Sequence, residues 1–204
     1  MSRRVVTRRN ALRILGAGAG SVAVLPWLSD DGLAAFAEIQ RRQAAPRLAV
    51  LSASQYATLA ALAEAIIPAD ERSPGAKEAR VADYVDLILS EGDDKLRQQW
   101  LDGLAALDAD AAARFGAPFV GLEAAQVEAM LTEVSRNEKV KDGKSPVEKF
   151  FVTAKQATIH GYYTSEIGIH KELRYKGNQI LAEFVGCQTV DGKDCPHCGQ
   201  KAQA

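Results

Sequence analysis

The chain has 204 residues, with 25 lysines and arginines against 26 acidic residues and a formal net charge of −1. This balance provides no basic surface of the kind that binds nucleic acid or anionic lipid, so we expect neither as a partner. Without the first 37 residues, which have the pattern of a leader, the remaining 167 of the 204 suffice for one ordinary domain with a buried core.

The N-terminus has the pattern of an export signal. Five arginines and no acidic residue occur in the first thirteen positions, and a charge-poor apolar run follows from residue 14 to residue 28. These are the charged and hydrophobic regions of a signal peptide. The pair Arg8-Arg9, within the sequence TRRNALR, resembles the twin-arginine signal. We therefore expect a periplasmic protein that is exported by the twin-arginine route.

The apolar run is too short for a permanent membrane anchor. It has 15 residues, contains three glycines and meets Pro26, whereas a membrane-spanning helix needs about 20 apolar residues. We therefore expect no transmembrane span. Ala35 and Ala37 flank Phe36 in the A-x-A arrangement of a cleavage site, which predicts cleavage after Ala37.

Four segments are predicted along the chain. They are a signal peptide over residues 1–37, a polar linker or arm over 38–50, a helical domain over 51–186, and a short irregular tail over 187–204 that contains every cysteine.

The central domain is predicted to be all-α, a single compact unit of about five or six helices. Ser52 and Gln55 have capping-box spacing before an apolar helical pattern that Pro68 ends. Further helical patterns cover residues 81–89, 94–115 and 122–134 and a segment that begins at Ser145-Pro146. We find no convincing strand pattern and no internal repeat.

No catalytic, cofactor-binding or metal-binding group is predicted in the helical domain. His160 and His170 are ten residues apart, which is not the i, i+4 spacing of a helical zinc site. No serine lies in a nucleophile elbow, and no glycine-rich loop fits a phosphate. We therefore predict a protein without an active site of its own.

The tail contains Cys187, Cys195 and Cys198. An odd number of cysteines in an oxidising compartment leaves one thiol over, either free or bonded to another chain. The spacing Cys195-x-x-Cys198, together with Cys187 and His197, also matches the ligands of a tetrahedral zinc site. The expected export favours disulfides, within the chain or between subunits, and zinc binding or thiol redox chemistry is the alternative.

Five short segments occur in an order and spacing that are specific to one family. They are Ala65-Ile66-Ile67-Pro68-Ala69-Asp70, Ser73-Pro74-Gly75-Ala76, Gly161-Tyr162-Tyr163-Thr164-Ser165-Glu166-Ile167-Gly168, Tyr175-Lys176-Gly177-Asn178 and Glu183-Phe184-Val185-Gly186-Cys187. In these segments the chain resembles the gluconate 2-dehydrogenase subunit 3 family, and the resemblance covers nearly the whole chain.

The resemblance implies a non-catalytic small subunit of a periplasmic FAD-dependent sugar or glycoside dehydrogenase, with glucoside 3-dehydrogenase as a candidate activity. Its partner would be a large flavoprotein of the glucose-methanol-choline type, which holds FAD and in some complexes an iron–sulfur cluster. A c-type cytochrome is a candidate electron acceptor. The small subunit would stabilise the flavoprotein and carry it through twin-arginine export, and Cys187 would bond to the large subunit.

Tyr162 and Tyr163, with Glu166, form a candidate docking surface, because tyrosine is enriched at protein interfaces. Burial of these tyrosines in the core explains them equally well. The alternative function is an exported zinc-binding or thiol-redox protein that uses Cys187, Cys195, His197 and Cys198.

Overall fold

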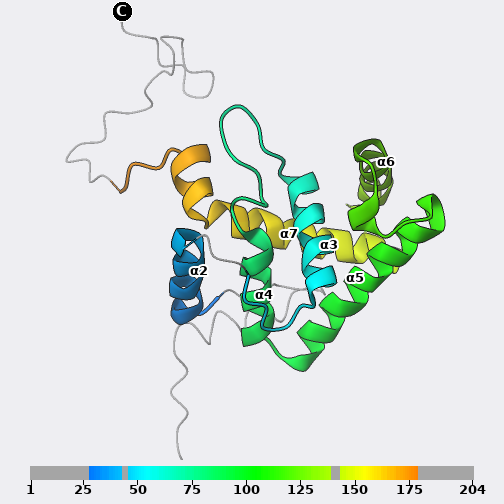
Figure 1. The fold of residues 1–204 in the computed structure, drawn as a ribbon, viewed down its shortest axis with the longest axis horizontal. Helices are drawn as coiled ribbons and strands as arrows, with labels where there is room; N and C mark the ends of the chain where they lie inside the picture. The colour runs from blue at the N-terminus through cyan, green and yellow to red at the C-terminus, as the bar shows by residue number, and fades with distance from the viewer. Residues whose placement is uncertain (1–27, 43–45, 139–142, 179–204) are drawn as a thin grey trace, which may run out of the picture. The chain divides into compact units, whose positions relative to one another are not determined.

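The computed structural model describes residues 28–42, 46–138 and 143–178. These residues form six α-helices and two short irregular helices, without any strand, which confirms the all-α prediction. The elements in chain order, drawn in Figure 1, are α2 (Asp30–Arg42), α3 (Ala53–Ile66), α4 (Val81–Glu91), α5 (Asp94–Phe115), η1 (Phe119–Gly121), α6 (Ala124–Ser135), α7 (Pro146–Tyr163) and η2 (Gly168–Glu172).

The starts of α3 and α7 are as the sequence predicts. Ser52 accepts a hydrogen bond from the backbone of Gln55, and the Gln55 side chain accepts one from the backbone of Ser52. The same reciprocal pair joins Ser145 and Glu148, with Pro146 in the first turn. Each pair satisfies two backbone N–H groups that a helix start otherwise leaves without partners.

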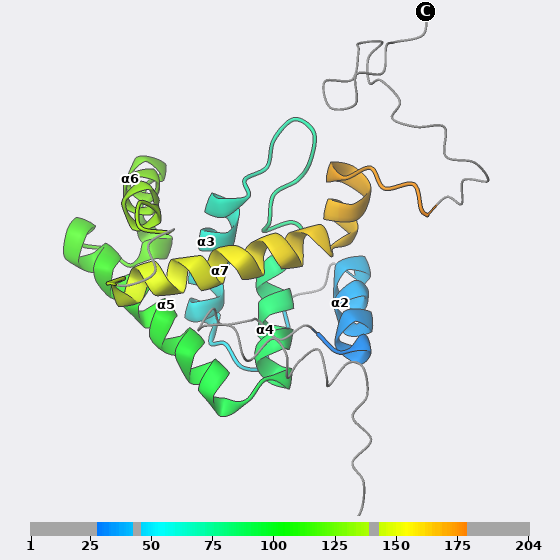
Figure 2. The same ribbon diagram turned by 180° about the vertical axis from the view of Figure 1, so that it is seen from behind.

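α7 is the central helix of the fold. It packs against α3, α4, α5 and α6, and Figure 2 shows it lying across α3, α4 and α5. Trp100 of α5 and Phe150 of α7 meet edge to face with ring centroids 5.5 Å apart. Gly103 permits this close approach, because a Cβ atom there would collide with the Phe150 ring. The core therefore lies mainly between α7 and the layer that it crosses.

α2 spans residues that the sequence analysis divided between a signal peptide and a linker or arm. It runs from Asp30 to Arg42, so it crosses the bond after Ala37, and the first five residues of the expected linker are helical. Two acids in its first turn and two arginines in its last turn suit the helix dipole. Both acids lie within residues 1–37, which the sequence analysis assigned to a signal peptide, so the sequence analysis did not predict a helix here.

The compact helical unit ends at Arg174, and residues from Tyr175 onward belong to a separate unit. The predicted boundary at residue 186 lies outside the described residues, as do Arg8, Arg9 and the tail with Cys187, Cys195, His197 and Cys198. Among the helices that are described, none has the length and apolar character needed to cross a membrane.

Candidate functional site

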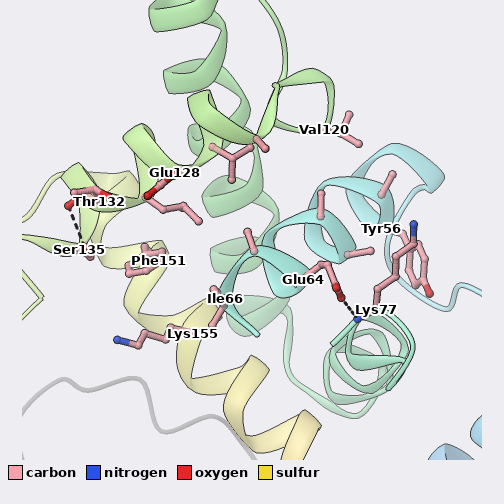
Figure 3. Close-up of a pocket in the computed structure, with 17 residues that line it drawn as sticks. Tyr56, Glu64, Ile66, Lys77, Val120, Glu128, Thr132, Ser135, Phe151 and Lys155 are labelled. Carbon is pink, nitrogen blue, oxygen red and sulfur yellow. Dashed lines mark hydrogen bonds between the residues drawn. The ribbon is translucent and has the colours of Figure 1, made fainter. Parts of the chain in front are cut away.

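A groove lies between α3, η1, α6 and α7. We call it the α3–α6–α7 groove; it has a volume of about 980 Å³ and a mostly apolar lining. Figure 3 shows side chains from all these helices around it. Its apolar surface comes mainly from Ala57, Ala60, Ala61, Ala65, Ile66, Val120, Ala124, Val127, Leu131 and Phe151.

The groove exists because one face of α3 carries small side chains. Ala57, Ala61 and Ala65 repeat every four residues and therefore lie along one face of the helix. Their methyl groups do not fill the space toward α6. This row of alanines was present in the sequence, where alanine is simply a good helix former. It is the signal that sequence reasoning missed.

Charged side chains also line the groove, and two of them, Glu64 and Lys155, have partners within the fold. Glu64 accepts hydrogen bonds from the backbone N–H groups of Ala69 at 3.1 Å and Lys77 at 2.8 Å, which closes the loop after α3. Lys155 forms an ion pair with Glu138 at 2.8 Å. These two charged side chains therefore stabilise the fold around an apolar surface.

Tyr56 lies between the groove and a buried ion pair. Its hydroxyl donates to Asp83 at 2.7 Å, and Arg80 also donates to that carboxylate through two nitrogens at 2.7 Å each. Burial and then the hydrogen bond to Asp83 raise the pKa of Tyr56. The tyrosine therefore stays protonated at neutral pH. Arg80 holds a left-handed backbone conformation at φ 60°, which orients its side chain at the start of α4.

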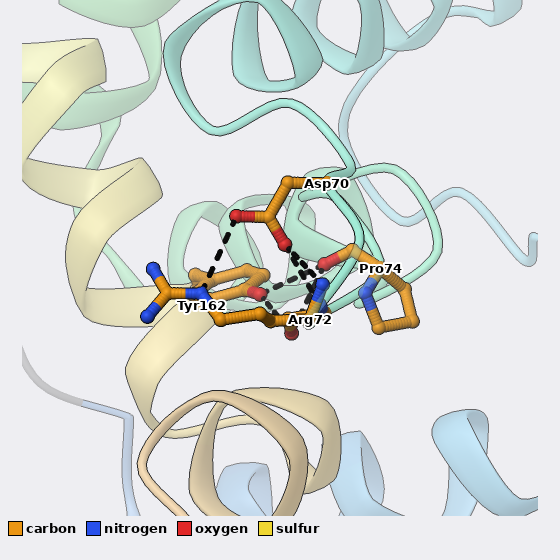
Figure 4. Close-up of polar contacts among 5 residues, drawn as sticks. Asp70, Arg72, Pro74 and Tyr162 are labelled. Carbon is orange, nitrogen blue, oxygen red and sulfur yellow. Dashed lines mark hydrogen bonds and ion pairs between the residues drawn. The ribbon is translucent and has the colours of Figure 1, made fainter.

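The end of α7 is tied to the loop between α3 and α4. The Tyr162 hydroxyl donates to the Pro74 carbonyl at 2.8 Å and shares a 2.7 Å hydrogen bond with the Ser73 hydroxyl. Asp70 accepts from the backbone N–H groups of Arg72 and Ser73, and these bonds lower the pKa of Asp70. Figure 4 shows the cluster, which joins three of the segments that carry the family resemblance.

This cluster corrects one of the expected docking residues. Tyr162 is 2% exposed and belongs to the core, which is the alternative given above for the tyrosines. Its neighbour Tyr163 is 39% exposed, and Glu166 is also exposed. Ile159, one turn before Tyr163 on α7, is 42% exposed. The exposed candidates at this end of α7 are therefore Ile159, Tyr163 and Glu166.

His160 is a structural histidine in this fold. Its Nδ1 atom shares a short hydrogen bond with the Tyr84 hydroxyl, and the two rings lie 5.7 Å apart. Burial lowers the pKa of His160 and raises that of Tyr84 to about 12. His170 is exposed in η2. No cluster of three metal-ligating side chains occurs within residues 28–42, 46–138 and 143–178.

One protein-family model matches most of the helical unit. The model of gluconate 2-dehydrogenase subunit 3 matches residues 53–179, which is more than half of the chain and runs from the start of α3 to beyond η2. No curated protein and no solved structure shows significant similarity. All the helices that line the α3–α6–α7 groove lie within the matched residues. The chain therefore belongs to the gluconate 2-dehydrogenase subunit 3 family.

Proposed function

We propose that this chain is the non-catalytic small subunit of a periplasmic FAD-dependent sugar or glycoside dehydrogenase, with glucoside 3-dehydrogenase as the candidate activity. Its partner is a large flavoprotein of the glucose-methanol-choline type, which holds FAD and, in one form of the complex, an iron–sulfur cluster. A c-type cytochrome accepts the electrons. The small subunit stabilises the flavoprotein and supplies the twin-arginine signal for both chains.

The family match carries this proposal, because it identifies an accessory subunit of a dehydrogenase complex. Export is supported by the pair Arg8-Arg9 and the apolar run that follows it. A route for folded cargo suits a small subunit whose partner acquires FAD before it crosses the membrane. In this proposal Arg8 and Arg9 direct the export of both the small and the large subunit.

The docking face in this proposal is the α3–α6–α7 groove, extended along α7 to Ile159 and Tyr163. The groove lies wholly within the residues that define the family, whereas α2 lies outside them. Val120 is 51% exposed and continues the apolar lining of the groove at the surface. A subunit seated on this face would bury Val120 and Tyr163 together with the apolar lining.

Export of the partner is tested by replacing Arg8 and Arg9 with lysine in a cell that makes both chains. We expect the large subunit to stay in the cytoplasm with its FAD bound, measured by cell fractionation and flavin fluorescence. Arg3→Lys with Arg4→Lys is the matched control, because it makes the same change elsewhere in the leader, and it should leave export intact. A large subunit that reaches the periplasm with the Arg8/Arg9 variant would contradict the proposal.

Docking is tested with Val120→Glu, which places a charge in the apolar groove. We expect the affinity for the large subunit to fall at least about tenfold, since an unpaired charge would be buried at the interface. Leu33→Glu is the matched control, because Leu33 is 41% exposed on α2, outside the groove. Equal binding by both variants, measured by co-purification and titration, would remove the groove from the docking face.

A further inference from the structure

α2 and the residue pair before it contribute two side chains to the main hydrophobic core, although most of this segment falls within the predicted leader. Leu28, just before the helix, and Phe36 within it are each 2% exposed. Phe36 meets the ring of Tyr84 on α4 edge to face, with centroids 5.2 Å apart. Figure 1 shows α2 lying beside α4. The apolar side of α2 is therefore part of the domain interior.

Polar contacts hold both ends of α2 in place. At its start, the backbone N–H of Ser29 donates to the Glu91 carboxylate at 2.8 Å, and the Ser29 hydroxyl donates to the same group. Gly32 lies where a Cβ atom would collide with that carboxylate. Near its end, Gln40 donates to the Ala79 carbonyl at 3.2 Å and accepts from the backbone N–H of Glu166 at 3.1 Å. α2 thus contacts the end of α4, the loop before α4 and the segment after α7.

Cleavage after Ala37 would dismantle this arrangement. The cut would remove Leu28 and Phe36 and leave only five residues of α2, too few for a stable helix. Tyr84, which is 1% exposed, would lose the ring that packs on it. The bond after Ala37 also lies inside a helix, whereas proteases cut exposed and flexible segments. The folded domain therefore protects the bond that the A-x-A pattern indicated.

We infer that α2 is a permanent part of the mature domain, so that removal of the leader by a signal peptidase, which hydrolyses a peptide bond with water, leaves Leu28 and the residues after it in the chain. The inference about cleavage rests on the proposed export. The packing of α2 against the domain is independent of export. The family match begins at residue 53, so α2 lies outside the matched residues. Through Gln40 it reaches the backbone of Glu166, beside the exposed end of α7.

The first test is the N-terminus of the chain recovered from the periplasm, made together with its partner and measured by intact mass. We expect every recovered chain to retain Leu28 and Phe36. A chain that begins at Glu38 would overturn the inference. If the chain stays in the cytoplasm at full length, the export proposal fails, and the second test decides the role of α2.

The second test uses the full-length chain and does not depend on export. Phe36→Ala should lower the melting temperature by roughly 10 °C, because it empties a site in the core. Leu33→Ala is the matched control on the same helix, and it should shift the melting temperature by no more than about 2 °C because Leu33 is partly exposed. Equal melting temperatures for the two variants would show that α2 is not held in the domain.

Discussion

The region around α4 and the region around α6 differ in how many of their residues are buried. Eight of the eleven residues of α4 are buried, whereas only two of the twelve residues of α6 are. α4 also buries two carboxylates, Asp83 at 4% and Asp86 at 3% exposure. Asp83 binds Arg80 and Tyr56, and Asp86 accepts from the backbone N–H groups of Ala49, Val50 and Leu51.

This difference separates structural polar groups from the surface available to a partner. Buried carboxylates are often candidate catalytic groups. Those of α4 instead accept hydrogen bonds that connect α4 to other parts of the chain. The α6 side has few buried residues and an open apolar groove beside it. Substitutions around α4 should therefore change stability, and substitutions in the groove should change binding to the partner.

The largest expected effect around α4 is that of Asp86→Ala. The carboxylate accepts three backbone hydrogen bonds, at 2.6, 3.0 and 2.8 Å, and its loss leaves those donors without a partner. We expect a loss of about 3 kcal/mol in unfolding free energy and a melting temperature roughly 6–12 °C lower, measured by circular dichroism. Asp102→Ala, at an exposed position of α5, should change stability by no more than about 0.5 kcal/mol. Similar losses of stability in the two variants would contradict the structural role of Asp86.

A glycine pair compares the two sides directly. A Cβ atom at Gly161 of α7 would lie 2.7 Å from the Tyr84 ring, which is itself enclosed, whereas at Gly121 beside the groove the nearest atom is 3.7 Å away. We expect Gly161→Ala to cost about 2 kcal/mol through overpacking, and Gly121→Ala to be neutral within about 0.5 kcal/mol. Urea unfolding measures both values. A neutral Gly161→Ala would mean that the contact between α4 and α7 is loosely packed.

Two adjacent tyrosines provide a finer comparison. Tyr162→Phe removes the hydroxyl that binds Ser73 and Pro74, and we expect a loss of about 1 kcal/mol, or roughly 2–4 °C in melting temperature. Tyr163→Phe is the control, because the ring of this exposed residue is kept and the change should not affect stability measurably. If Tyr163→Phe were the more destabilising variant, the assignment of Tyr162 to the core would be wrong.

The smallest effect is a dependence on pH through His160. Its pKa is lowered in the folded state by burial, so below about pH 6.5 the unfolded chain takes up the proton more readily. This contribution to stability is complete above that pH and is lost as the pH falls. The drop in melting temperature between pH 7 and pH 5 should be roughly 1–2 °C larger in the native chain than in His160→Gln. An identical drop in both chains would contradict a lowered pKa for the partly buried His160.

Much of the helical framework was predictable, because its signals are local. The caps at Ser52 and Ser145 act within three residues, and an apolar stripe along α5 needs only its own sequence. α2 was not predictable in the same way. The burial of Phe36 depends on Tyr84, and nothing near Phe36 in the sequence indicates that partner.

The candidate site was harder to predict for a related reason. Tyr162 and Tyr163 are neighbours in sequence, but successive residues of a helix point about 100° apart, so one lies in the core and the other at the surface. Which one is buried depends on the loop at Ser73 and Pro74. The groove likewise depends on how far α6 lies from the alanine face of α3, and this distance is determined by packing.

The bond between Gln40 and Glu166 has a consequence for the order of folding. It joins positions 126 residues apart, and the contacts around it require α4 and the end of α7 to be in place. Contacts between such distant parts of a chain form late, because the loop between them must first be ordered. We therefore expect α2 to become fixed only when α4 and the end of α7 have folded.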